Sequence, residues 1–539
     1  MNPWIKRLLA LCLAVSLLLG GCAAPDLDGF WQGLQNIIHT GMATPFAEME
    51  YTRPDVDAVV NQAAKAAALS QTETDAKALM EEVYTCYEIY YSFYTNYMLA
   101  NIYYCTDMTS SYWEEEYNHC LSAANEADAA MDSLLYELAD CSLREELEQD
   151  AFFGEGFFDA YQGNSLWDET FSALIEEETE LLALYYDLSA QALEETSYSD
   201  AYFTKWGIQF ECLFAELVNL RRQIARYAGY ESYVEFAYDY YYHRDFSPQQ
   251  TADYLTQIRQ ELSQLYAAVP SAVWDAGRNR SPENQTLEYV ESFADKMGGT
   301  MADAFALMKS AGLYNISVSD KKYPVSFEVY LPSYFAPYVF MDAQGTAADK
   351  LTFSHEFGHF CSDYAASGSA AGTDVAEVFS QAMEYLGLCY TDNAQPLEKM
   401  KLADSLCLMV EQSAYATFEH RLYTADGELT VENIRAIYES AAKESGIAAG
   451  DWDCRDYVMV PHFFTNPLYV ISYVISNDAA MQLYEAELET PGAGLALLED
   501  GLVSQQTSIL AFLEETGLES PFHPSRAKEL ADIFQDGIW

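Results

Sequence analysis

Residues 351–362 read LTFSHEFGHFCS and contain the motif His355-Glu356-Phe357-Gly358-His359. On an α-helix, a spacing of four residues places both imidazoles on one face, within reach of a single tetrahedral ion. The chain has only eight His, so a chance match to HExxH is expected in roughly one such sequence in a hundred. The motif therefore predicts a zinc site with His355 and His359 as ligands and Glu356 as the base that accepts a proton from water.

A third metal ligand is expected on a second helix, because a catalytic zinc takes three protein ligands and keeps one position open for water. Residues 374–384 read DVAEVFSQAME and place acidic side chains on a helical pattern. Glu377 and Glu384 share one face, so spacing alone allows either of them as the third ligand. Asp374 is a candidate for orienting a ligand histidine from behind the metal site.

The sequence around the motif excludes two other groups of zinc peptidases. A metzincin would continue to a glycine and a third histidine, but positions 362 and 365 are Ser362 and Ala365. Membrane-alanyl aminopeptidases carry a GxMEN strand ahead of HExxH, whereas residues 340–354 read FMDAQGTAADKLTFS. Neither group fits this chain.

The rest of the chain is helical in pattern, with one exception. From about residue 46 to about residue 320, and again after residue 345, apolar residues recur at three- and four-residue steps. Residues 323–343, YPVSFEVYLPSYFAPYVFMDA, are aromatic and β-branched, which predicts two or three short strands with Pro332 and Pro337 at turns or edges. The fold class is therefore predicted to be mainly α, with a small β-sheet just before the HExxH helix.

Two stretches carry a resemblance to a known family. Residues 337–360, PYVFMDAQGTAADKLTFSHEFGHF, followed by DVAEVFSQAMEY, resemble the catalytic core of the thimet oligopeptidase and oligopeptidase F family of zinc metallopeptidases. Segments at 228–255, around residue 418 and at 462–473 agree, so the resemblance spans roughly residues 200 to 530. It implies a large two-lobed helical zincin-type fold with a deep substrate groove.

The resemblance also implies an activity and a ligand set. The family's zinc ligands are the two histidines and the glutamate of a VxE segment, which here fall on His355, His359 and Glu377, with one Zn²⁺ per chain. The implied function is a zinc-dependent endopeptidase, an oligopeptidase that hydrolyses internal bonds of short or unstructured peptides, with Glu356 as general base.

The C-terminal segment HFFTNPLYVISY carries the remaining implied site residues. The family places a His and several Tyr hydroxyls against the substrate, and these match His462, Tyr469 and Tyr473. Many relatives have Tyr-Val-Tyr-x-Tyr, whereas this chain has Ile471 at the middle position. Which tyrosine stabilises the oxyanion is therefore open at the level of sequence.

The N-terminus predicts export. Lys6 and Arg7 precede an apolar run, LLALCLAVSLLL, which has the length of a signal h-region and is short for a membrane span. The run ends in Leu19-Gly20-Gly21-Cys22, which resembles the lipobox of bacterial lipoproteins. We therefore expect residues 1–21 to be a lipoprotein signal peptide and Cys22 to be lipidated.

This signal implies an extracytoplasmic protein that is lipid-anchored to a bacterial membrane. No second apolar stretch of 18 or more residues follows, so the anchor would be the membrane contact. We predict a tether at residues 22–45, an N-terminal helical region at 46–200, and a zinc metallopeptidase catalytic region at 201–539.

Charge and cysteine content limit the possible partners. The 84 acidic and 27 basic residues give a formal charge of −57, which would repel a phosphate backbone, so peptides are expected as partners and nucleic acid is not. Nine of the eleven Cys remain after Cys12 in the signal and Cys22 are set aside, and they show no CxxC pair. Cys361 lies two positions beyond His359, so it points away from the ligand face and is expected to pack in the core.

Two alternative functions remain compatible with the sequence. One is a catalytically inactive peptide-binding lipoprotein on the same fold, and the other is a narrowly specific zinc protease that cuts one exported substrate. The intact Glu356 argues against the first, because a binding protein does not need a base between its metal ligands.

Overall fold

The computed structural model describes residues 44–150, 152–154, 156–161, 166–192, 202–366, 371–448, 452–504 and 506–539. The predicted signal peptide, Cys22 and nearly all of the predicted tether lie outside the described residues. Within these ranges, no helix has both the length and the apolar character needed to cross a membrane.

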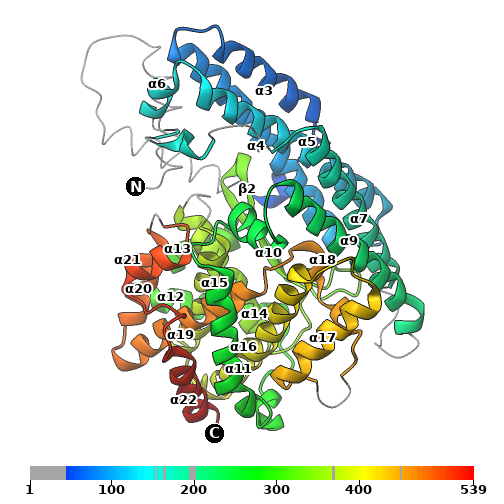
Figure 1. Ribbon diagram of the computed structural model, residues 1–539. Helices are drawn as coiled ribbons and strands as arrows, with labels where there is room; N and C mark the ends of the chain where they lie inside the picture. The colour runs from blue at the N-terminus through cyan, green and yellow to red at the C-terminus, as the bar shows by residue number, and fades with distance from the viewer. Residues whose placement is uncertain are drawn as a thin grey trace.

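The chain is mainly α-helical, as the sequence predicts (Figure 1). The helices are α3 (Val56–Ser70), α4 (Ala76–Thr106), α5 (Ser111–Asp140), α6 (Arg144–Gln149), α7 (Glu169–Ala192), α9 (Ile208–Tyr227), α10 (Tyr233–Phe236), α11 (Pro248–Tyr266), α12 (Glu283–Met297), α13 (Gly299–Ala311), α14 (Asp349–Ala366), α15 (Thr373–Cys389), α16 (Gln395–Thr424), α17 (Val431–Ser445), α18 (Pro461–Thr465), α19 (Ile471–Glu489), α20 (Ala493–Leu502), α21 (Ile509–Thr516) and α22 (Arg526–Ile538).

Helix ends follow local sequence chemistry. Ser247 precedes α11 and forms a capping box with Gln250, while Pro248 occupies the first helical position, where its missing N–H costs nothing. The side chain of Asp75 accepts a hydrogen bond from the backbone N–H of Lys77 and so caps α4. These caps are determined by residues within one turn of each helix start.

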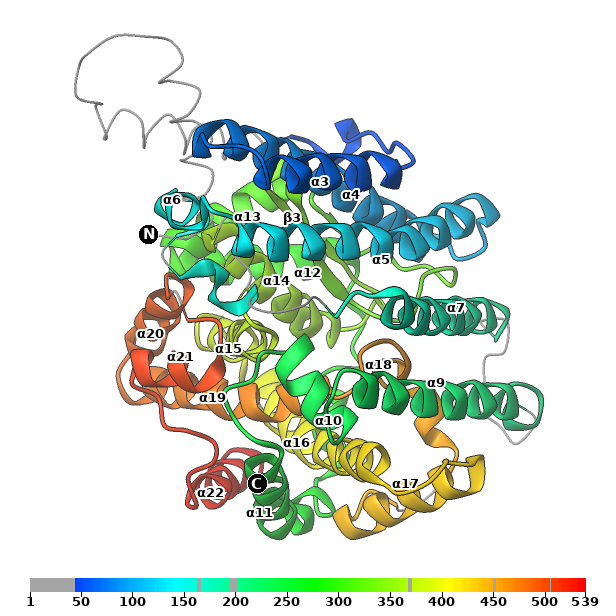
Figure 2. The same ribbon diagram turned by 45° about the horizontal axis from the view of Figure 1, so that its top comes forward.

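The first three helices form a layer of their own. Helices α3, α4 and α5 pack against one another around a separate apolar cluster that includes Val83 and Leu134. Figure 2 shows this layer lying across the strands and helices α12 to α14. Helix α4 also packs on β2 (Phe327–Leu331), so the layer is joined to the rest of the protein next to the sheet. A much larger core of buried side chains fills the remainder.

The predicted strands form a three-stranded sheet of order β1-β3-β2. Strands β2 and β3 (Ala336–Phe340) are an antiparallel hairpin joined by a 3₁₀ turn that begins at Pro332, which confirms the predicted strands and the turn at Pro332. Pro337 was predicted at a turn or edge and instead lies within β3, the central strand. Strand β1 (Tyr314–Asn315) pairs in parallel with β3 and was not predicted, because two residues carry no recognisable alternation. Pro337 is tolerated in the central strand since β1 pairs only with residues 339 and 340.

The sheet leads into the two helices that carry the predicted zinc ligands. Helix α14 packs on β3 and on α15, and α15 in turn packs on α19, so α15 lies between the HExxH helix and the C-terminal segment. Gly358 is at the crossing of α14 and α15, where an added Cβ would lie 2.5 Å from the carbonyl oxygen of Phe379 and from Cα of Ser380. Only glycine permits this approach of the two backbones.

Candidate metal centre and active-site cleft

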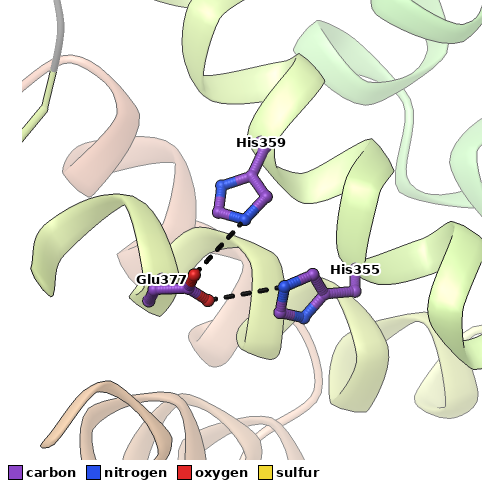
Figure 3. A group of neighbouring side chains, drawn as sticks. All are labelled: His355, His359 and Glu377. Atoms are coloured by element: carbon purple, nitrogen blue, oxygen red, sulfur yellow. Dashed lines mark ion pairs between the residues drawn. The ribbon is translucent and has the colours of Figure 1, made fainter. Parts of the chain in front are cut away.

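The three predicted zinc ligands converge. His355 and His359 lie one turn apart on α14, and Glu377 approaches them from α15 (Figure 3). Their donor atoms all lie within 4.8 Å of one another. His355 Nε2 is 3.4 Å from Glu377 Oε2, and His359 Nε2 is 3.8 Å from Glu377 Oε1.

These separations suit a zinc ion. Ligand atoms bonded at about 2.0–2.1 Å to a tetrahedral ion lie roughly 3.3–3.4 Å apart, close to the two distances between the His355 and His359 nitrogens and the Glu377 oxygens. Two imidazole nitrogens and one carboxylate oxygen are also the donor set of known catalytic zinc sites. The three residues therefore fit the metal that the sequence predicts.

The second acidic residue on the same helix face, Glu384, takes a different place. Its Oε1 lies 3.0 Å from Nδ1 of His355, and its Oε2 lies 2.8 Å from Nζ of the buried Lys401 on α16. When Nδ1–H of His355 donates a hydrogen bond to Glu384, Nε2 carries no proton and its lone pair faces Glu377. Glu384 is thus the carboxylate that orients His355, and Glu377 is the one at the metal position.

Asp374 does not contact a ligand histidine. Its carboxylate accepts hydrogen bonds from Arg244 and from the Ser472 hydroxyl, at 3.1 Å from Arg244 Nε and 2.5 Å from Ser472 Oγ. Arg244 also donates to the backbone carbonyl of Leu468. Because Asp374 is in the first turn of α15, it joins that helix to the C-terminal segment, and Glu384 has the orienting position that the sequence suggested for Asp374.

The C-terminal residues reach the same site from α18 and the start of α19. The hydroxyl of Tyr469 donates to Oε1 of Glu377 at 2.5 Å, and Ser380 donates to Oε2 of the same carboxylate at 2.9 Å. The hydroxyl of Tyr473 lies 3.1 Å from Nε2 of His462. Tyr469 therefore contacts a metal-ligand candidate directly, whereas Tyr473 and His462 form a separate pair.

One cavity of about 460 Å³ is lined by every predicted site residue of the described chain except Glu384 and Asp374, that is, by His355, Glu356, His359, Glu377, His462, Tyr469 and Tyr473. Glu356 lies on its wall with both histidines, and burial raises the pKa of this carboxyl to about 8, against the opposing effect of the His355 charge. Two further acidic residues line the cavity, Glu328 on β2 and Asp363 on α14.

Sequence reasoning missed three residues of this region. Asp363 follows His359 by four residues, so it continues the stripe of His355 and His359 by one more turn, and that spacing was an available signal. Glu328 and Lys401 gave no such signal, because each reaches the site from a distant part of the chain through tertiary packing.

Comparison with known proteins agrees with this fold. Residues 46–164 match the peptidase M3 N-terminal domain. A solved structure named as an oligoendopeptidase F aligns with a TM-score of 0.80 at 19% identity, over 92% of this chain and 98% of that chain. A structure from Bacillus anthracis str. Ames that is also named as an oligoendopeptidase F aligns with a TM-score of 0.79 at 16% identity, over 92% of this chain and 98% of that chain.

A structure of PZ peptidase A with an inhibitor gives a TM-score of 0.79 at 17% identity, over 91% of this chain and 99% of that chain. A search of curated proteins gave no match. Structural likeness at these identities establishes a shared fold. Together with the match to the M3 N-terminal domain, it supports the resemblance to the peptidase M3 and oligopeptidase F family.

Proposed function

We propose that the protein is a zinc-dependent oligopeptidase that hydrolyses internal bonds of short or unstructured peptides. The observation that carries this proposal is the convergence of His355, His359 and Glu377 within 4.8 Å, in a cavity that Glu356 also lines. The M3 match and the shared fold support a peptidase independently of this geometry.

The proposed ligands are His355, His359 and Glu377, for one Zn²⁺ per chain. Zinc bound there would supply Lewis-acid polarisation of the scissile carbonyl and would lower the pKa of water. Glu384 holds His355 in the tautomer that leaves Nε2 free, and Lys401 fixes Glu384 in turn. Tyr469 and Ser380 hold the two oxygens of Glu377.

Glu356 is the proposed general base. It accepts the proton of the attacking water and then passes it to the leaving amine, so it acts as base and afterwards as acid. Its place on the cavity wall beside both histidines is the position that this role needs.

Tyr473 is the proposed donor to the oxyanion, with His462 as its hydrogen-bond partner. Tyr469 is already engaged with Glu377, so its hydroxyl stabilises a ligand carboxylate, whereas the hydroxyl of Tyr473 faces the imidazole of His462. A preorganised donor of this kind stabilises the negative charge that develops on the carbonyl oxygen in the transition state. Ile471 is buried and contributes no hydroxyl.

The decisive experiment uses a mixed pool of unstructured peptides, the zinc-loaded chain lacking residues 1–22, and mass spectrometry of the products. We expect cuts at internal bonds that disappear with a chelator. Glu356→Gln should retain zinc and lose nearly all hydrolysis, because only the proton transfer is removed. Near-normal hydrolysis by that variant would overturn the mechanism. Intact peptides beside bound zinc would favour a peptide-binding protein or a narrowly specific protease.

We also propose that the protein is exported and anchored to a bacterial membrane by a lipid on Cys22. The support is the basic-apolar-lipobox pattern of the first 22 residues. Metabolic labelling with a radioactive fatty acid should label the full chain and not a Cys22→Ala variant. Equal labelling of both proteins would refute the anchor.

A further inference from the structure

The active-site cavity has an acidic wall that the proposed reaction does not use. Asp363 lies one turn beyond His359 on α14, about 6 Å further along the helix axis. Glu328 faces α14 from the edge strand β2, on the same strand face as Tyr330. Both carboxylates line the cavity that contains His355 and Glu356.

Glu328 and Asp363 hydrogen-bond to each other, and Glu328 also accepts a hydrogen bond from the backbone N–H of Tyr338, but neither carboxylate has the cationic partner that buried charges normally have. No ion pair within the described part of the chain includes Glu328 or Asp363. Oε1 of Glu328 is buried and has no hydrogen-bond partner there, and neither has the buried hydroxyl of Tyr330 beside it. A buried carboxylate oxygen without a donor is costly, so a group that supplies donors at this place would be bound favourably.

The charged groups around Glu328 and Asp363 are also negative. Burial raises the pKa of Glu328 well above its usual range, and the negative charges of Asp363 and Glu356 raise it further. Burial likewise raises the pKa of Asp363 to about 7. Among the described residues, those that line the cavity include four carboxylates and no Lys or Arg. The other two carboxylates, Glu356 and Glu377, already have roles in the proposed reaction.

We propose that Glu328 and Asp363 form a recognition site for a cationic group of the substrate, so that the cleft selects peptides carrying a positive charge at one fixed distance from the scissile bond. An ammonium or guanidinium group in the cavity would donate hydrogen bonds to both carboxylates and supply the positive charge that the pair lacks. This inference rests on the proposed function only in assuming that a bond of the peptide is cleaved; the preference for binding a cationic group does not depend on cleavage. The positive charge can belong to a Lys or Arg side chain or to the peptide's own α-amino group.

The test compares peptides that differ only in charge. One internally quenched, otherwise neutral peptide is made with Lys at each position in turn, and each version is paired with a Gln version, with and without N-terminal acetylation. The zinc-loaded protein should cleave one Lys peptide roughly 10- to 100-fold better in kcat/KM than its Gln partner, the range expected for hydrogen bonds to a charged group. If the α-amino group is the ligand, acetylation should instead cause that loss.

The variants Asp363→Asn and Glu328→Gln keep the size of each side chain and remove its charge. In each variant the ratio between the preferred cationic peptide and its neutral partner should fall towards one. The matched control is Asp320→Asn, an exposed carboxylate outside the cavity, which should keep the full ratio. Two variants are used so that poor folding of one does not decide the result.

A binding measurement separates this inference from the proposed function. Fluorescence anisotropy with the Glu356→Gln protein should show the same preference for the cationic peptide. Hydrolysis with no charge preference in any position, or a preference that survives in both carboxamide variants, would overturn the inference and leave the proposed function standing. A charge-dependent binding preference without hydrolysis by the wild-type protein would uphold the inference and refute the proposed function.

Discussion

Replacing Gly358 with alanine should damage the metal centre without changing any ligand. A Cβ at this position would lie 2.5 Å from the Phe379 carbonyl oxygen and from Cα of Ser380, whereas ordinary van der Waals contact begins at 3.4 Å. The difference, 3.4 − 2.5, is about 0.9 Å, and both opposing atoms belong to the backbone of α15. The helices α14 and α15 must therefore move apart by nearly this distance.

That displacement is large compared with what the site tolerates. His355 and His359 lie on α14 and Glu377 lies on α15, so the separation acts directly on the distances between ligands. Metal–ligand distances tolerate only about 0.2 Å, and a misplacement of about 1 Å costs about 100-fold in rate. We expect Gly358→Ala to lower zinc affinity and kcat/KM by about 100-fold or more, and to lower stability by about 1–3 kcal/mol through overpacking.

The assay is equilibrium dialysis against zinc followed by metal analysis, together with peptide hydrolysis at saturating zinc and thermal unfolding. The matched control is Gly537→Ala on α22, where the new Cβ would meet only the Leu402 side chain and no backbone atom. This control should retain zinc affinity and activity. If Gly358→Ala binds zinc and hydrolyses peptides like the wild type, the close approach of the two helices does not hold the ligands together.

Three other predictions follow from single contacts. Tyr473→Phe should lower kcat by about 100- to 1000-fold with unchanged zinc content, because one oxyanion donor is lost; a kcat within twofold of wild type would assign that role elsewhere. Glu384→Gln should weaken zinc binding by about 10- to 100-fold through loss of the orientation of His355, which zinc titration against a competing chelator would measure; unchanged affinity would refute the orienting role. Burial, with the positive charge of Arg244, lowers the pKa of His420 to about 4. Between pH 6.5 and pH 4 the unfolded chain therefore binds a proton at this residue that the folded chain does not bind. The free energy of unfolding consequently decreases as the pH is lowered through that window. In urea unfolding at pH 7 and pH 4.5, wild type should lose about 2–3 kcal/mol more than His420→Gln, and equal losses would contradict the assigned shift.

Sequence alone determined those features that depend on local spacing. The four-residue spacing of His355 and His359 places both on one face of α14, whatever that helix packs against. The aromatic, β-branched run at 323–343 forms the β2–β3 hairpin as predicted, with Pro332 at the turn. Each of these results follows from the periodicity of a single segment, and that periodicity depends only on residues that are consecutive in the sequence.

Tertiary structure decided what each acidic residue near the site does. Glu377 and Glu384 share a face of α15, so spacing could not separate the ligand from the residue that orients His355. The crossing of α14 and α15 at Gly358 brings Glu377 to the Nε2 atoms and Glu384 to Nδ1 of His355. The same packing brings Glu328 from a strand to the cavity wall. Contacts between helices and strands depend on how their surfaces pack together. The periodicity of one helix or strand shows which side chains share a face, but it does not show which other element packs against that face.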